Sequence, residues 1–291
     1  MDVKFLSHGK ECRAWLYLPE GQRKPPVIVM AHGIACEKAF RLPAFAERFV
    51  QRGLAVLVFD YRYIGESDGG PRNLVYYKRQ LEDWKNAVAF VRTLSEVDRE
   101  SIGLWGTSFS GGHVLVTAAK DSKIKAVSAH VPFTDGLSLL RTKGIFNLFN
   151  IFRAGFTDLY RTISLTRPFF IPVVARPGTL AFMNHSGAME GYFAMIPANS
   201  RWENKCPARS CLSIPLYRPI RYASKISCPA LIIMGDRDQV IPPRSVLKLS
   251  RRLKRRELVR LPMDHFDSYV GEMFEKVVER QADFFARQLL G

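Results

Sequence analysis

The segment "LWGTSFSGGHV" (residues 104–114) places three glycines around Ser108, where apolar residues typical of a strand run into a helix. Glycine weakens both kinds of element, so its presence here needs a structural reason. Two interpretations compete: a tight connection between strand and helix, or a strained turn that presents Ser108 as a nucleophile. The rest of the chain decides between them.

Short apolar segments that favour strands alternate with longer amphipathic segments that favour helices on both sides of Ser108. Because the strands are apolar throughout and separated by helices, we expect an α/β protein with a doubly wound, mostly parallel sheet of about eight strands. The segments around "VKFL" and "CRAWLYL" add an antiparallel edge. Expected strands are 25–33, 54–60, 101–106, 124–131, 228–236 and 257–262, and expected helices are 42–53, 76–94, 110–120, 243–254 and about 268–289.

Residues 136–222 break this alternation and are rich in proline, glycine and aromatic residues. They are too apolar for a disordered linker. We therefore predict a core domain formed by residues 1–135 and 223–291, with a helical cap, or lid, formed by 136–222 and inserted after the sixth strand.

One part of the predicted cap, "GIFNLFNIFRAGF" (144–156), has aromatic residues at the spacing of one helix face: Phe146, Phe149, Phe152 and Phe156. Most of them are expected to pack the cap onto the core. We predict that Phe149 and Phe152 also line the cleft above Ser108 and favour an apolar substrate.

The composition is that of an ordinary globular protein, with 47% hydrophobic and 24% charged residues in 291. No apolar stretch reaches the roughly 18 residues of a membrane span, and "MDVKFLSHGKECRAW" lacks the apolar run of a secretory signal. We expect a cytoplasmic protein without stable membrane insertion. Its five cysteines show no repeated C-x-x-C spacing, so thiols are expected, although Cys206 and Cys211 are close enough in sequence for a bridge.

The formal net charge is +16, and the densest basic cluster is "RRLKRR" (251–256). We place this cluster at a helix end, where cations complement the helix dipole. It has neither a recognisable motif nor interleaved aromatic residues, so no nucleic-acid partner is expected. The sequence also lacks metal-ligand spacing and a G-x-G-x-x-G segment, so no metal and no cofactor are expected. The expected partner is a small-molecule acyl substrate, and a homodimer is left open.

Chemically useful side chains fall at the carboxyl ends of the predicted strands, the edge where ligands gather in a doubly wound sheet. A serine, carboxylates and histidines from separate strands therefore meet at one rim, which favours the nucleophile interpretation. These residues are His32, Asp60, Ser108, His130, Asp236, Asp238 and His265.

The chain resembles a serine hydrolase of the α/β-hydrolase superfamily over almost its whole length. "GTSFSGG" is similar to the G-x-S-x-G nucleophile elbow of that family, although Ser110 stands where the final glycine would be. The order of serine, acid and histidine also matches, with the last two in "MGDRDQVIPP" and "LPMDHFD". The broader pattern resembles dienelactone-hydrolase-like and peptidase-related hydrolases, fungal thiohydrolases and polyketide transferases. A serine at position 108 in place of cysteine argues against a true dienelactone hydrolase.

The resemblance implies a role for each residue. Ser108 is the nucleophile and His265 its base, because a serine hydroxyl attacks only when a base removes its proton. The acid is Asp238 or Asp236, and the family's spacing selects Asp238. The backbone N–H groups of Ile34 and Phe109 would form the oxyanion hole.

His130 is the one serious rival among the histidines, as a residue that lines the substrate pocket. The leading hypothesis is a carboxylesterase-type serine hydrolase that cleaves esters of apolar acyl groups through a Ser108 acyl-enzyme. The alternative is a thioesterase or acyltransferase that uses the same intermediate. An aminopeptidase or a non-catalytic binding protein on this fold is less favoured.

Overall fold

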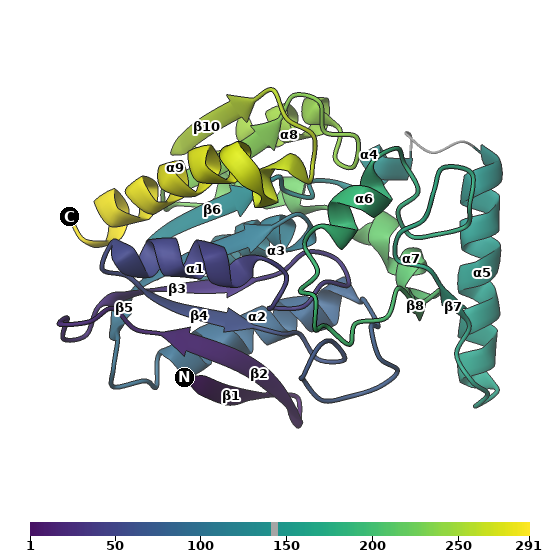
Figure 1. Ribbon diagram of the computed structural model, residues 1–291, viewed down its shortest axis with the longest axis horizontal. Helices are drawn as coiled ribbons and strands as arrows, with labels where there is room; N and C mark the ends of the chain where they lie inside the picture. The colour runs from purple at the N-terminus through teal and green to yellow at the C-terminus, as the bar shows by residue number, and fades with distance from the viewer. Residues whose placement is uncertain (141–144) are drawn as a thin grey trace.

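The computed structural model describes residues 1–140 and 145–291. In these residues eight strands form one twisted sheet in the order β1-β2-β4-β3-β5-β6-β9-β10 (Figure 1). β1 pairs antiparallel with β2 and β2 with β4, whereas the other pairs are parallel. The bounds are β1 (Asp2–Ser7), β2 (Lys10–Tyr17), β3 (Pro26–Ala31), β4 (Ala55–Phe59), β5 (Asp98–Thr107), β6 (Ala126–His130), β9 (Ala230–Gly235) and β10 (Arg256–Leu261). The predicted mostly parallel sheet and its antiparallel edge are confirmed.

Helices cover both faces of the sheet, and most of them bury one apolar side. In α1 (Leu42–Gln51), for example, Leu42, Phe45, Ala46 and Phe49 recur at helical spacing and are buried. α1 packs with α9 (Gly271–Leu289) on one face, and α2 (Tyr77–Val91) packs with α3 (Phe109–Lys120) on the other. α8 (Pro243–Ser250) connects β9 to β10. The sheet is thus covered on both faces, as its continuous apolar strands require.

The chain between β6 and β9 forms a separate group of short elements off the carboxyl ends of the parallel strands (Figure 1). It contains a two-stranded sheet, and α5 stands at the outer edge of the molecule. The elements are α4 (Gly136–Leu140), α5 (Ile145–Ile163), β7 (Phe170–Ile171), α6 (Ala188–Phe193), β8 (Cys206–Pro207), α7 (Ser210–Ser213), and the 3-10 turns η1 (Ile214–Leu216), η2 (Pro219–Arg221) and η3 (Ala223–Lys225). A last 3-10 turn, η4 (Asp267–Tyr269), precedes α9.

The structure shows where the basic cluster lies and that the cysteines are unbridged. The basic cluster 251–256 lies at the C-terminus of α8, which ends at Ser250 with Arg251 as its C-cap residue, and the last residue of the cluster, Arg256, starts β10. All five cysteines are buried thiols, so no bridge joins Cys206 to Cys211. No helix in the described part of the chain combines the length and apolar character needed to cross a membrane.

Candidate active site

The turn between β5 and α3 explains the glycines of the opening segment. A Cβ at Gly106 would lie 2.3 Å from the carbonyl oxygen of Ser110, and a Cβ at Gly111 would lie 2.8 Å from Cα of Pro132. One at Gly112 would lie 2.7 Å from the carbonyl oxygen of Phe133. These distances are too short for any side chain, so the glycines allow α3 to start directly against β5 and the chain after β6.

Ser108 sits at this turn with φ 53° and ψ −116°, a left-handed backbone conformation that is costly for a residue with a side chain. Its backbone N–H donates to the carbonyl of His130 at 2.8 Å, and its own carbonyl accepts from the Phe133 N–H at 2.8 Å. These bonds hold the turn in place, and the side chain remains half-buried. Strain that the surroundings maintain in this way is typical of a functional turn.

The structure brings Ser108, His265 and Asp238 together, and we call these three residues the triad. His265 Nε2 lies 3.0 Å from Ser108 Oγ, and His265 Nδ1 lies 2.8 Å from Asp238 Oδ2. Both distances are within hydrogen-bond reach, so the three side chains form one continuous hydrogen-bonded series.

Asp238 is itself fixed by the backbone after β9. Its Oδ1 accepts the N–H groups of Val240 at 2.8 Å and Ile241 at 2.7 Å, which leaves Oδ2 for His265. Asp236, the alternative acid, is exposed and pairs with Arg260 at 3.0 Å. The structure therefore places Asp238, and not Asp236, beside the histidine.

The loop after β3 also lies next to Ser108. A Cβ at Gly33 would lie 3.2 Å from Ser108 Cβ and 3.7 Å from its Oγ, so the backbone of this loop passes next to the hydroxyl. The N–H groups of Ile34 and Phe109 have no hydrogen-bond acceptor among residues 1–140 and 145–291. Two unused donors near a serine hydroxyl can receive an oxyanion.

Ser110, which departs from the family's glycine, has a specific contact. Its buried hydroxyl donates to the carbonyl of His32, and it also contacts the hydroxyl of Tyr61. Tyr61 in turn accepts from Trp84 Nε1 at 2.7 Å. The hydroxyl therefore ties the start of α3 to the end of β3, whereas the sequence indicated only that a small residue fits.

The segment between β6 and β9 contributes contacts that the sequence did not indicate. The hydroxyl of Tyr192 in α6 donates to the carbonyl of Ile34 at 3.0 Å, and Trp202 Nε1 donates to the carbonyl of Ala35 at 2.8 Å. α6 also packs against Phe266 beside His265, since a Cβ at Gly191 would lie 2.5 Å from Phe266 Cβ. No local pattern marks Tyr192 or Trp202, because both lie more than 150 positions from the loop they contact.

His130 corrects a prediction, because it does not line a pocket. Its side chain is fully buried between Phe45, Trp105 and Tyr269. Its Nε2 shares a hydrogen bond of 2.7 Å with Ser268 Oγ. The end of β6 points this ring into the core beneath the triad, and only the backbone carbonyl of His130 reaches Ser108.

Phe149, predicted to line the cleft above Ser108, is exposed, and Phe152 is half-buried. Both lie on α5, which packs chiefly against α7, and the side chain of Phe149 points into solvent. The helical spacing correctly predicted a helix, but Phe149 and Phe156 are turned away from the core. The side chain of Phe146 lies outside the described residues.

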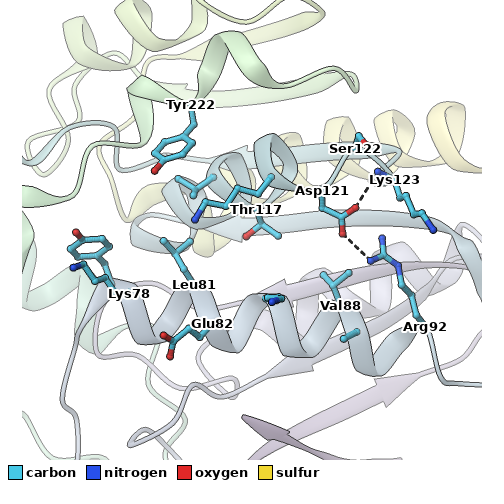
Figure 2. A pocket seen from close by; sticks show the side chains of 15 residues that line it. Lys78, Leu81, Glu82, Val88, Arg92, Thr117, Asp121, Ser122, Lys123 and Tyr222 are labelled. Atoms are coloured by element: carbon cyan, nitrogen blue, oxygen red, sulfur yellow. Dashed lines mark hydrogen bonds and ion pairs between the residues drawn. The ribbon is translucent and has the colours of Figure 1, made fainter. Parts of the chain in front are cut away.

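A groove of about 940 Å³ lies between α2 and α3, away from the triad. Figure 2 shows Lys78 and Tyr222 toward one end and the pair Arg92–Asp121 toward the other, with Leu81 and Val88 between them. Arg92 lies 2.9 Å from Asp121. No triad residue is among the described residues that line this groove, so it is separate from the candidate active site.

The free energy of unfolding should depend on pH because two histidines, His113 and His130, are buried. Burial lowers the pKa of His113 and of His130 to about 3, whereas a histidine in the unfolded chain titrates near about 6.5. Between these values the unfolded chain binds more protons, so stability falls as the pH is lowered, by about 1.4 kcal/mol per pH unit for each histidine. His130→Gln should reduce the slope of unfolding free energy against pH by about one proton, as urea titrations would measure. An unchanged slope in His130→Gln would contradict the account.

The eight-stranded sheet and the turn at Ser108 define an α/β hydrolase. The model of the X-Pro dipeptidyl-peptidase (S15) family matches residues 9–168, more than half of the chain, and the protein therefore belongs to this family. This confirms the resemblance to the peptidase-related members of the superfamily.

Three known proteins are similar to this chain over nearly its whole length. The chain is 42% identical to the quorum-quenching protein AidA of Acinetobacter baumannii, over 99% of this chain and 94% of that protein. It is 29% identical to the polyketide transferase af380 of Aspergillus fumigatus, over 99% of this chain and 98% of the relative. The crystal structure of the α/β hydrolase GrgF from Penicillium superposes with a TM-score of 0.87 at 26% identity, over 100% of this chain and 99% of that one.

Proposed function

We propose that this protein is a serine hydrolase that cleaves carboxylic esters of apolar acyl groups through an acyl-enzyme on Ser108. The observation that carries the proposal is the hydrogen-bonded series from Ser108 Oγ to His265 at 3.0 Å and on to Asp238 at 2.8 Å. The serine is partly accessible while His265 and Asp238 are buried, so the reacting atom can meet a substrate while the base and the carboxylate that orients it are shielded from water.

The chemistry follows from the positions of these atoms. His265 Nε2 takes the Ser108 hydroxyl proton while Oγ bonds to the ester carbonyl carbon, and the carbonyl oxygen becomes an oxyanion. The tetrahedral intermediate collapses, the bond to the alcohol breaks, and His265 returns the proton to the leaving oxygen. Water then attacks the acyl-serine by the same route and releases the carboxylic acid. Asp238 keeps the proton on Nδ1, so that Nε2 is the basic nitrogen.

We place the oxyanion between the N–H groups of Ile34 and Phe109. Gly33 brings the first donor next to Ser108, and the second opens α3, where the positive end of the helix dipole adds to the attraction. Nearby apolar side chains, Ile34 and Phe266, support an apolar acyl group as the substrate. The residues 136–222 would then act as a cap through α6, rather than through Phe149 and Phe152. The buried thiols suit a reducing cytoplasm.

Tyr192 and Trp202 bond to the carbonyls of Ile34 and Ala35 in the loop after β3. We therefore predict that residues 136–222 hold the Ile34 N–H in position for the oxyanion. Tyr192→Phe removes the hydroxyl bonded to the Ile34 carbonyl but keeps the ring, so the loop loses one anchor without a cavity. We expect kcat to fall about tenfold to a hundredfold, as for a small misplacement of a catalytic group, with little change in KM. Affinity for a boronic-acid transition-state analogue should fall in parallel.

Tyr222→Phe is the matched control for this variant, since that ring lies at the α2–α3 groove. It should behave as the wild type in kcat, KM and inhibitor affinity. A Tyr192→Phe enzyme with an unaltered kcat would mean that the hydroxyl serves only the packing of α6.

Acyl transfer is the second candidate. It is supported by a relative named polyketide transferase that matches nearly the whole chain, and by the closeness of the GrgF fold. The two reactions share the Ser108 acyl-enzyme and differ in what resolves it: water in hydrolysis, and an alcohol or thiol in transfer.

A substrate panel tests the proposal. p-Nitrophenyl esters from acetate to palmitate should show kcat/KM rising with chain length until the pocket fills, by at most about fourfold per CH₂ (about 0.8 kcal/mol). Acylated lactones belong in the panel because lactones are esters and because a 42% identical relative is a quorum-quenching protein. Thioesters and added alcohols test the alternative. Products that are acids even with excess alcohol support hydrolysis, predominant acyl-alcohol products support transfer, and turnover of no acyl substrate would overturn both.

A further inference from the structure

The helix α5 is amphipathic, and the side that the rest of the chain covers carries Ile151, Ala154, Gly155 and Asp158, whereas a second apolar side is left exposed. Gly155 packs against Leu212, where a Cβ would lie 2.8 Å from the leucine side chain. Asp158 is fully buried, pairs with Arg209 at 3.0 Å and accepts the backbone N–H of Phe169 at 2.8 Å. These contacts fix the rotation of α5 about its axis, so they also fix which side chains face outward.

The opposite side of α5 is an exposed apolar surface. It continues into the residues after the helix. α5 stands at the outer edge of the molecule (Figure 1). We call the following residues the outer stripe, with the exposed fraction of each: Phe149 66%, Phe156 60%, Leu159 39%, Tyr160 70%, Ile163 74% and Leu165 93%.

The size of the outer stripe matches a protein interface. With about 200 Å² for each large side chain, the exposed fractions amount to roughly 700–800 Å² of apolar surface. A standard interface covers about 800 Å² on each partner, whereas isolated exposed apolar residues are common and carry no such meaning. The exposed apolar area of the stripe is therefore of the size that each subunit of a standard interface buries.

We infer that the outer stripe is a homodimer interface, in which α5 packs antiparallel on α5 of a second copy. The stripe runs along the helix at positions 149, 156, 160 and 163, with Phe156 at its centre. A two-fold axis at Phe156 sets Phe149 opposite Ile163 of the second copy, so the surface is complementary to itself. It also brings Arg153 near the ring of Tyr160 of the second copy, a favourable cation–π arrangement.

The charges of α5 favour a second copy over a lipid surface. Adsorption to anionic lipid calls for a cluster of about four to eight lysines and arginines beside the apolar face. Among the described residues of α5, only Arg153 and Arg161 are cationic, and they lie within a helix whose one carboxylate faces inward. The outer stripe is therefore better suited to an apolar contact with a second copy than to adsorption on anionic lipid.

Sedimentation equilibrium of the full chain tests this inference directly. The wild type should be a dimer, Phe156→Asp should be a monomer, and an equimolar mixture of Phe156→Asp with Phe156→Lys should recover the dimer. The control is Leu6→Asp on β1, which replaces an equally exposed apolar residue (67%) elsewhere and should remain dimeric.

A disulfide trap tests the position of the two-fold axis. Because all five native cysteines are buried, Phe156→Cys adds one accessible thiol, and mild oxidation should link two chains through it. A monomeric wild type, a dimer that survives Phe156→Asp, or a monomer that binds phosphatidylglycerol vesicles through the stripe would each overturn the inference. None of these readouts uses enzyme activity, so they are independent of the proposed reaction.

Discussion

Ser108→Ala should reduce ester hydrolysis by at least about 10⁴-fold, and by up to about 10⁶-fold, to the level of the uncatalysed background. The loss is this large because the hydroxyl oxygen forms the covalent bond of the intermediate, and no other group in the triad can replace it. Alanine tolerates the left-handed backbone no worse than serine does, so the fold should be retained. Steady-state kinetics with p-nitrophenyl esters and a thermal melt measure the two effects separately.

Ser110→Ala is the matched control, since it removes a buried hydroxyl two residues away. That hydroxyl anchors the carbonyl of His32, so its loss should lower stability and cost far less activity than Ser108→Ala. An active Ser108→Ala enzyme would contradict the mechanism. Equal losses in both variants would mean that the turn, and not the Ser108 hydroxyl, was being measured.

Asp238→Asn should lower kcat by about 10⁴-fold, as the corresponding change does in serine proteases. Asparagine can donate to Nδ1, which would move the histidine proton to Nε2 and leave no base facing Ser108. Two backbone N–H groups still bind the remaining oxygen, so the loop after β9 should keep its shape. Rates of ester hydrolysis under saturating substrate give the effect.

Asp236→Asn is the control for this change, because Asp236 pairs with Arg260 at the surface. A surface pair of this kind contributes at most about 1 kcal/mol, so activity should stay near that of the wild type. If Asp236→Asn were the inactive variant, the acid would have been assigned to the wrong carboxylate.

The sheet and the triad's positions could be predicted from local patterns. Continuous apolar strands determine a parallel sheet, and parallel strands deliver their last residues to one edge. Ser108, Asp238 and His265 each follow such a strand, so topology predicts them at one edge, whereas the choice of Asp238 over Asp236 came from the resemblance to the family. The antiparallel edge could be predicted in the same way, from two alternating segments before the first buried strand.

Contacts between distant segments could not be predicted. Tyr192 and Trp202 lie in a region without periodic pattern, and only the folded chain shows that they hold the loop at Ile34. His130 follows a strand like the triad residues, but a strand end does not specify whether its side chain turns toward the rim or into the core. The aromatic spacing of α5 indicates a face, but not that the rest of the chain leaves Phe149 and Phe156 on that face uncovered.

The most direct test of the central claim is the mass of the intact protein after treatment with a fluorophosphonate. The account predicts one adduct per chain, located by peptide mapping on Ser108, absent in Ser108→Ala and strongly slowed in His265→Ala. An adduct on another residue, or labelling of wild type and Ser108→Ala at the same rate, would contradict the assignment of Ser108 as the nucleophile.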